Sequence, residues 1–128
     1  MLVETSITTA DLGDVGPQAA RLEAVGYDIL TTQENRHDPY LPMAVAAVNT
    51  NSVTLATSVA IAFPRSPMVA ANVGWDLQRA TGGRFELGLG SQVKGHNERR
   101  FSVPWSAPAP RMEEYVSAVK AIWRTWAQ

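Results

Sequence analysis

Gly82-Gly83-Arg84-Phe85-Glu86-Leu87-Gly88-Leu89-Gly90-Ser91-Gln92 is the stretch of this 128-residue chain that decides its fold. The pair of glycines is typical of the end of a helix, and the apolar run from Phe85 to Gly90 is typical of a strand. Glycines at the end of a strand allow a ligand or another backbone to approach closely. The stretch therefore predicts a parallel strand whose carboxyl end faces a ligand.

The same alternation of strand and helix occurs three times upstream. Residues 2–8, 27–32 and 53–62 are short segments rich in β-branched and apolar side chains, which predict strands. The segment 53–62 has apolar or small residues at almost every position, as expected for a strand that is buried on both sides. Thr8 and Thr9 follow the first strand, at an end where ligands gather in parallel sheets.

Helical segments separate these strands. Asp14, Gly16 and Pro17 are expected to open the first helix and Gly26 to end it. Each of the next two helices is expected to begin with a capping residue followed by proline, and these starts are Asp38-Pro39 and Ser66-Pro67. The last helix has the clearest helical period, from Met112 to Trp126.

Four βα units in one domain, residues 1–128, are the architecture that this order predicts. The longest connection is an expected loop from Gln92 to Pro110. Two α/β folds accept four such units. One is half of a TIM-type (β/α)8 barrel, which has roughly 250 residues when complete. The other is a small open parallel sheet.

Composition excludes several classes of protein. The charge is nearly balanced, with 11 basic and 12 acidic residues and no basic run, so no nucleic-acid surface is expected. The chain has no cysteine, which excludes disulfides and thiolate metal sites. The longest apolar run is shorter than the about 20 residues that span a bilayer, and the N-terminus lacks a signal-peptide pattern. We therefore expect a cytoplasmic protein that does not bind membranes.

Polar side chains gather after the second and fourth predicted strands. The segment Gln33-Glu34-Asn35-Arg36-His37-Asp38 contains two groups, Glu34 and His37, that could move protons beside a bound cofactor. A plainer interpretation is that Asp38 caps a helix while Glu34 pairs with Arg36. After the fourth strand, His96 stands where a phosphate loop requires lysine, which argues against a nucleotide triphosphate site. With only His37 and His96 as imidazole ligands, no metal site is expected.

Three passages make the chain similar to the luciferase-like flavin and deazaflavin oxidoreductases, a family that includes monooxygenases and folds as a (β/α)8 barrel. The passages are Gly26-Tyr27-Asp28 with Glu34 and Asp38-Pro39, then Leu55-Ala56-Thr57-Ser58-Val59 with Pro64-Arg65-Ser66-Pro67, and finally Asp76-Leu77 through Gly82–Gly90 to Glu98 and Phe101. The resemblance covers essentially all 128 residues and corresponds to the N-terminal half of a family barrel.

The resemblance implies an oxidoreductase that transfers hydride between a flavin-type cofactor and a small organic substrate. The cofactor would be F420, with FMN as the alternative. The peptide bond Ser58–Val59 would be cis and would lie beneath the cofactor ring. Catalytic roles would fall to Glu34 and His37, and cofactor contacts to Asn35, Ser58, Val59, Gly90, Ser91 and Gln92. Asn35 occupies a position where many relatives have histidine.

A half-barrel would differ from a complete barrel in how it holds a cofactor and in how it associates with other chains. It would lack the later loops that hold the cofactor's phosphate in the family. It would also expose two sheet edges and an apolar sheet face, and such edges pair with other chains. We therefore expect a homo-oligomer, such as a dimer of two halves. The alternative function is a catalytically silent half-barrel that serves as a binding or assembly module.

Overall fold

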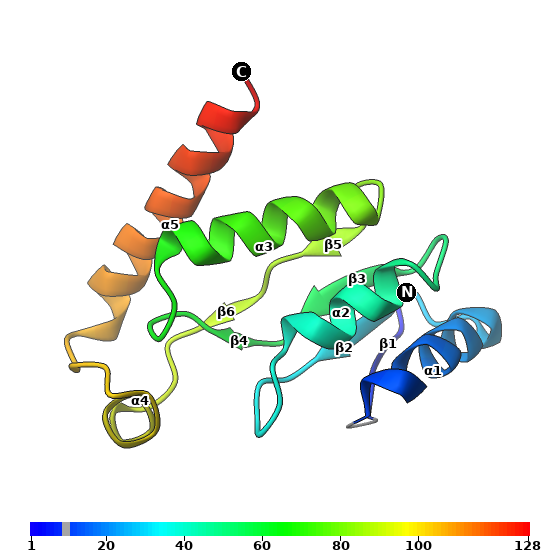
Figure 1. The fold of residues 1–128 in the computed structure, drawn as a ribbon, viewed down its shortest axis with the longest axis horizontal. Coiled ribbons are helices and arrows are strands. Elements are labelled where there is room, and N and C mark those ends of the chain that lie inside the picture. The colour runs from blue at the N-terminus through cyan, green and yellow to red at the C-terminus, as the bar shows by residue number, and fades with distance from the viewer. Residues whose placement is uncertain (9–10) are drawn as a thin grey trace.

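The computed structural model describes residues 1–8 and 11–128, and within these ranges the chain forms six strands and five helices (Figure 1). The strands are β1 (Glu4–Ser6), β2 (Ile29–Thr32), β3 (Thr54–Thr57), β4 (Ala60–Ile61), β5 (Phe85–Glu86) and β6 (Leu89–Gly90). The helices are α1 (Leu12–Val25), α2 (Tyr40–Ala47), α3 (Pro67–Ala80), α4 (Lys94–Phe101) and α5 (Pro108–Trp126).

The strands pair in the order of the chain. β1, β2, β3 and β5 form a parallel sheet in that order, and β4 and β6 form a second parallel pair. This confirms the predicted α/β fold with a parallel sheet. The predicted strands 53–62 and 85–90 are each divided in two, because the ladder between them is interrupted at residues 58–59 and 87–88.

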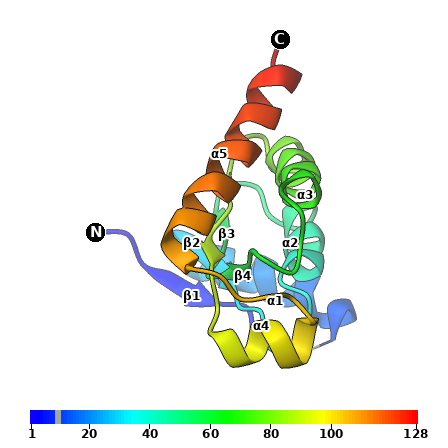
Figure 2. The same cartoon turned by 90° about the vertical axis from the view of Figure 1, so that its left-hand side faces the viewer.

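Helices α1, α2 and α3 cover one side of the sheet (Figures 1 and 2). Leu30, Leu55 and Phe85 are adjacent in register, and they are buried in a core to which Val15 of α1 and Met43 of α2 also contribute. Burial of such side chains is the main force that holds the helices to the sheet, at about 1.5–3 kcal/mol each.

The other side of the sheet carries polar as well as apolar side chains, so it is not the wholly apolar face that was expected. Side chains alternate along a strand, so the next row lies on the uncovered side. That row consists of Ser6, Thr31, Ala56 and Glu86 in neighbouring strands. Thr31 in β2 and Glu86 in β5 each follow a core residue, Leu30 and Phe85, and lie on the opposite side of the sheet.

The predicted start of α3 is confirmed, whereas the predicted start of α1 is wrong by a few residues. Ser66 caps α3 as predicted, since its hydroxyl accepts a hydrogen bond from the N–H of Val69 at 3.2 Å. The first helix begins earlier than Asp14, because Asp11 accepts a hydrogen bond from the N–H of Gly13 at 2.8 Å and serves as the cap. Pro17 therefore lies inside α1, and Gly26 ends it in the left-handed conformation as predicted.

Helix α4 lies within the segment 92–110 that the sequence analysis assigns to a loop. Its sequence, Lys94-Gly95-His96-Asn97-Glu98-Arg99-Arg100-Phe101, has no apolar period. The helix is held instead by the fully buried amide of Asn97, whose nitrogen donates to the carbonyls of Ser91 and Val93 at 2.9 and 3.1 Å. A polar anchor therefore replaces the usual apolar face.

Helix α5 packs against α3 at Gly74. A side-chain carbon at Gly74 would lie 2.7 Å from the indole of Trp123, so the close approach of the two helices requires glycine there. The indole nitrogen of Trp123 donates to the carbonyl of Ala71 at 2.9 Å, and Trp75 contacts Trp126 edge to face with 5.5 Å between ring centres.

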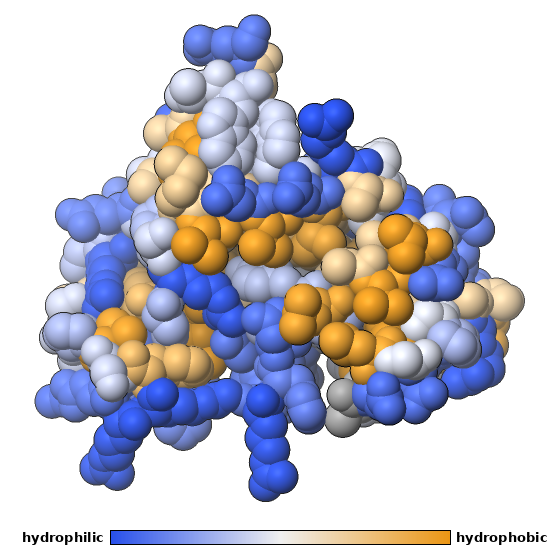
Figure 3. All heavy atoms as spheres, in the orientation of Figure 1, coloured by the Kyte–Doolittle hydropathy of each residue, from blue (hydrophilic) through white to orange (hydrophobic). Residues whose placement is uncertain are grey.

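The outer surface over α2 and α3 carries apolar side chains (Figure 3), among them Leu41, Val48, Met68 and Val69, which are all exposed. Across the described residues, no helix combines the length and the apolar character needed to cross a bilayer.

Candidate functional site

The junction between the third and fourth strands is irregular. Ser58–Val59 is a cis peptide bond, as predicted. Leu55 pairs with Phe85, 30 residues later, whereas Ala60 pairs with Leu89, 29 residues later. The third strand therefore contains one extra residue between β3 and β4. A bulge of this kind turns side chains away from the regular alternation of the sheet.

Thr57 bridges the break in the ladder. Its hydroxyl accepts a hydrogen bond from the N–H of Gly88 at 2.9 Å and donates one to the carbonyl of Gly88 at 2.8 Å. A side-chain carbon at Gly88 would overlap the carbonyl oxygen of Thr57, and one at Gly90 would lie 2.5 Å from Val59. Gly88 and Gly90 of the opening motif are therefore required by the neighbouring strand, and Gly90 supports Val59 directly.

The uncovered side of the sheet is hollowed at this junction. This sheet-face hollow has a volume of about 290 Å³, and its lining is formed by Glu4, Ile29, Thr31, Ala56, Thr57, Ser58, Val59, Glu86, Leu87 and Gly88. The predicted cofactor residues Ser58 and Val59 thus lie together on its wall. Both are exposed, and Val59 is 43% exposed although it is aliphatic.

A second hollow lies at the carboxyl ends of β1 and β2. This strand-end hollow has a volume of about 350 Å³ and is lined by Ser6, Ile7, Thr8, Thr32, Gln33, Asn35, His37, Asp38 and Pro42. It brings the predicted residues Asn35 and His37 together. Thr8 also lines it, whereas Thr9 lies outside the described residues.

The two hollows adjoin. Ser6 lines the strand-end hollow and Thr31 lines the sheet-face hollow, and their hydroxyl oxygens are 3.1 Å apart in a hydrogen bond. Five of the eight residues predicted to form the site therefore fall in two places: Asn35 and His37 in one hollow, Ser58 and Val59 in the other, with Gly90 behind Val59.

Glu34 lies beside the hollows in an ion pair. Both of its carboxylate oxygens accept hydrogen bonds from the guanidinium of Arg65, at 2.8 and 2.9 Å, and one also accepts from the N–H of Ile61 at 2.6 Å. The side chain of Glu34 is 4% exposed and that of Arg65 is 17% exposed. Burial lowers the pKa of Arg65, but the hydrogen bond and charge of Glu34 outweigh it, and the net shift is upward. Glu34 thus pairs with Arg65 rather than with Arg36.

This ion pair positions the strand ends. Ile61 belongs to β4 and Glu34 follows β2, so the carboxylate ties the segment after β2 to the segment after the bulge. Asp38 extends the cluster, since one of its oxygens lies 3.3 Å from Arg65 and the other caps α2 at the N–H groups of Tyr40 and Leu41. Burial is the main reason that the pKa of the nearby Tyr40 hydroxyl is raised.

Ser91 and Gln92 form the turn that leads from β6 into α4. The carbonyl of Ser91 accepts a hydrogen bond from Asn97, and Gln92 has a positive φ of 55° with its side chain bonded to the N–H of Val93. Neither residue lines the two hollows described above.

Thr57 and Arg65 stand in the passages that carry the family resemblance, but sequence reasoning gave them no role, and it did not indicate Ser6 and Thr31. Arg65 follows the third strand just as Glu34 follows the second, and carboxyl ends of adjacent parallel strands meet, so their pairing carried a usable signal. Ser6 and Thr31 gave none, because single hydroxyl residues in strands are common.

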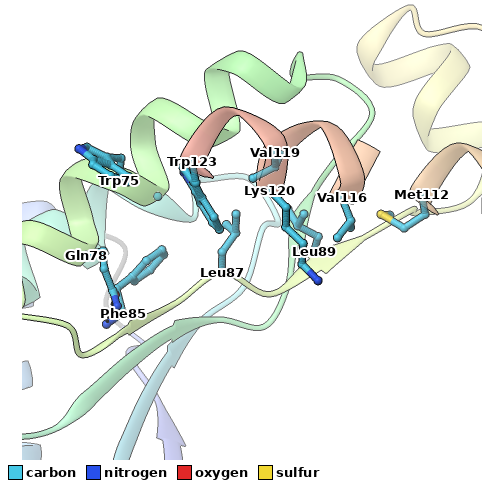
Figure 4. Close-up of a pocket in the computed structure, with 11 residues that line it drawn as sticks. Trp75, Gln78, Phe85, Leu87, Leu89, Met112, Val116, Val119, Lys120 and Trp123 are labelled. Carbon is cyan, nitrogen blue, oxygen red and sulfur yellow. Dashed lines mark hydrogen bonds between the residues drawn. The ribbon is translucent and has the colours of Figure 1, made fainter. Parts of the chain in front are cut away.

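A larger hollow than these two lies elsewhere, between α3, α5 and the outer edge of β5 and β6 (Figure 4). It has a volume of about 500 Å³, and apart from Gln78 and Lys120 its side chains are apolar or aromatic. Its polar groups are the amide of Gln78 and the ammonium of Lys120, with no carboxylate or imidazole. Among the described residues no three His, Asp or Glu side chains lie close enough to hold a metal ion.

Comparison with known proteins extends these observations. An uncharacterized protein of Mycobacterium tuberculosis is 52% identical over 108 residues, which is 84% of this chain and 32% of that protein. Another protein of the same organism, which bears the name of a coenzyme F420-dependent oxidoreductase, is 32% identical over 81% of this chain and 30% of its own length. The chain spans about a third of the length of these relatives.

Two solved structures share the fold. The oxygenating component of 3,6-diketocamphane monooxygenase from Pseudomonas putida, in complex with FMN, has a TM-score of 0.82 and 16% identity over 96% of this chain and 40% of that chain. The coenzyme F420-dependent tetrahydromethanopterin reductase from Methanopyrus kandleri has a TM-score of 0.71 and 17% identity over 88% and 37%. The α/β fold with its parallel sheet is thus shared with part of each of these chains, which is consistent with a partial barrel. The sequence profile of the luciferase-like monooxygenases matches residues 2–127, and the chain therefore belongs to the luciferase-like monooxygenase family.

Proposed function

We propose that this chain forms the ring-binding part of an oxidoreductase that transfers hydride between F420 and a small organic substrate. The observation that carries the proposal is the exposed pair Ser58 and Val59, which stands on the wall of a partly polar hollow in a chain 32% identical to a protein named for F420. FMN is the alternative cofactor, supported by a structure that shares the fold at only 16% identity.

The residues present fit a flat, partly polar ring. Val59 offers an aliphatic surface for one face of such a ring, and Gly90 keeps Val59 in place because no other side chain would leave it room. Ser58 supplies a hydroxyl on the same wall, and Asn35 supplies an amide in the adjoining hollow. Hydroxyls and amides both donate and accept hydrogen bonds, which suits the carbonyl and N–H edge of a flavin-type ring.

When bound, the cofactor would supply the hydride chemistry, and the chain's part is to bind, orient and handle protons. His37 lines the strand-end hollow and is exposed, so it is the residue we propose for proton transfer with substrate. Glu34 is proposed to act by holding the strand ends through Arg65. The segments that would complete the barrel define the substrate, so the activity of a complete enzyme is part of this proposal.

Titration with each cofactor tests the proposal. We expect F420 fluorescence to be quenched in a saturable manner, with weaker or no binding of FMN. Val59→Asp should weaken F420 binding at least tenfold, because it places a charge on the proposed ring surface. Val25→Asp is the matched control, since Val25 is an aliphatic residue 70% exposed on α1. Folded protein that binds neither cofactor would contradict the proposal and favour an assembly module.

The expected homo-oligomer remains a proposal as well. Its support is the exposed apolar surface of α2 and α3, described above.

A further inference from the structure

The uncovered side of the sheet carries two carboxylates without a cationic partner. Glu4 of β1 and Glu86 of β5 both line the sheet-face hollow and are exposed. Among the described residues the ion pairs are those of Arg65 with Glu34 and Asp38, so no described cation neutralises Glu4 or Glu86. The sheet-face hollow therefore contains fixed negative charge.

The adjoining strand-end hollow does not balance this charge. Its titratable groups are His37 and Asp38, and Asp38 is shared with Arg65 at 3.3 Å. Arg65 lies beside the hollows, but both carboxylate oxygens of Glu34 already accept hydrogen bonds from its guanidinium. Carboxylates therefore outnumber the single imidazole on the described walls of the two hollows, and no lysine or arginine lines either of them.

The stability of the fold gives no reason for these two carboxylates. Glutamate is depleted in strands relative to β-branched and aromatic residues. Neither Glu4 nor Glu86 contributes to the core, which lies on the other side of the sheet with Leu30, Leu55 and Phe85. Because the two carboxylates are unpaired and exposed, their effect is on whatever occupies the hollow.

Negative charge on this wall acts on the oxidation state of a bound ring. The proposed function places a flavin-type ring against Val59 in the same hollow, and the inference rests on that function. A ring that accepts a hydride gains two electrons and one proton, so it gains one negative charge. Nearby carboxylates repel this charge, and the repulsion grows as the ring displaces water, because the effective dielectric constant falls. Charge beside the ring is one of the means by which proteins tune such cofactors.

We propose that Glu4 and Glu86 favour the oxidised form of the bound cofactor, so that the site works as a hydride donor and reduces a carbonyl substrate. In this direction the hydride leaves the reduced ring with two electrons and forms a C–H bond at the carbonyl carbon. The π bond of the carbonyl breaks, its electron pair moves to the oxygen, and a proton from His37 completes the alcohol. The ring loses one negative charge in this step, and the two carboxylates favour that loss.

Equilibrium dialysis under anaerobic conditions tests the inference with oxidised F420 and with chemically reduced F420. We expect the oxidised form to bind about threefold more tightly than the reduced form, or better, because of the repulsion described above. Binding and reduction form a closed thermodynamic cycle, so the ratio of the two dissociation constants fixes the shift of the reduction potential on binding. Equilibration of the bound cofactor with a reference dye measures the same shift independently, and we expect the potential to fall. If FMN is the cofactor that binds, oxidised and reduced FMN are compared in the same way.

Neutral variants assign the effect to the two carboxylates. Glu4→Gln with Glu86→Gln keeps the size of the side chains and removes their charge, so the ratio of dissociation constants should fall towards one and the potential of the bound cofactor should rise. The matched control is Asp76→Asn with Glu113→Gln, at exposed positions of α3 and α5 that line neither hollow, and it should leave the ratio unchanged. If the double variant does not fold, Glu4→Gln and Glu86→Gln are measured singly, and each should lower the ratio.

The outcomes separate this inference from the proposed function. Equal binding of the two forms by the unmodified chain, or a ratio that the glutamine variants leave unchanged, would overturn the inference while cofactor binding itself stands. Folded protein that binds neither F420 nor FMN would overturn both.

Discussion

Gly88 lies so close to Thr57 that any side chain at this position would overlap the neighbouring carbonyl oxygen. Backbone atoms cannot yield as a flexible side chain does, so Gly88→Ala must push the third and fourth strands apart. We expect this change to lower the free energy of unfolding by about 3 kcal/mol or more. Urea unfolding followed by circular dichroism measures it.

Gly95→Ala is the matched control. Gly95 lies inside α4, and a side-chain carbon there would meet no atom within 4 Å. Alanine is the better helix former, so this variant should gain about 0.5–1 kcal/mol. If Gly88→Ala unfolded at the same urea concentration as the unmodified chain, the tight junction described here would be wrong.

Glu34 and Arg65 form an ion pair, and replacing only one of the two should destabilise the fold more than half as much as replacing both. Removing either charge leaves the other in a largely buried position, and such losses cost about 3–5 kcal/mol, whereas removing both costs less. We expect Glu34→Gln and Arg65→Met each to destabilise the chain by about 3 kcal/mol, with the double variant well short of the sum. Unfolding of the four proteins in urea gives the coupling energy, and simple additivity would show that the pair does not act as a unit.

At the scale of elements, Glu23 joins α1 to the turn before β3. Its carboxylate accepts hydrogen bonds from three consecutive N–H groups, those of Asn51, Ser52 and Val53, at 2.8–3.0 Å. Burial alone would raise the pKa of Glu23, but these hydrogen bonds outweigh it and the net shift is downward. A depressed pKa in the folded state means that the carboxylate stabilises the fold above the unfolded value, and that this contribution is lost as pH falls through the folded pKa.

Glu23→Gln tests this link through its pH dependence. We expect the variant to be less stable by about 1–2 kcal/mol at neutral pH, because charge-assisted hydrogen bonds become neutral ones. The difference should shrink as pH falls below 4.5, the ordinary pKa of the side chain. Urea midpoints across this pH range measure it, with Glu113→Gln at an exposed position of α5 as control. A constant difference at every pH would contradict the assignment.

The order and type of the larger elements could be predicted from the sequence, because each carries its own local signal. The cap and proline of Ser66-Pro67 predict the start of α3, and the helical spacing of apolar residues in 112–126 predicts α5. Helix α4 could not be predicted, since its stability comes from the hydrogen bonds of Asn97 to a turn that exists only in the folded chain. The division of the third strand was equally hidden, because the bulge depends on Thr57 and Gly88 meeting across 31 residues.

The candidate site also contains features with a local sequence signal and features that depend on contacts between distant residues. Resemblance to a family predicted the cis bond between Ser58 and Val59, since the motif specifies a local backbone feature, and both residues line one hollow. It did not indicate that Glu34 would be held by Arg65 or that Ser6 and Thr31 would join two hollows. Those relations depend on the register of adjacent strands, and a single sequence leaves register open.

The whole molecule presents two contrasting surfaces. The sheet face is acidic, while the outer surface of α2 and α3 is apolar (Figure 3), with Leu41 54% and Val69 46% exposed. Helix α2 has no charged residue along its eight positions, a composition more typical of a helix that is covered all round. If the expected homo-oligomer forms, this outer surface is where we expect the copies to meet, because closure through the sheet faces would confront like charges.

Leu41→Glu combined with Val69→Glu should convert such an oligomer to monomer, since each protomer would bring two carboxylates into an apolar contact. Sedimentation velocity over a concentration series measures the shift, and we expect the dissociation constant to rise at least a hundredfold. Val25→Glu is the control, because Val25 is 70% exposed on α1 and lies outside this surface. An oligomer that withstands the double change must use another surface, and an unmodified chain that is monomeric at every concentration would show that copies of this chain do not associate.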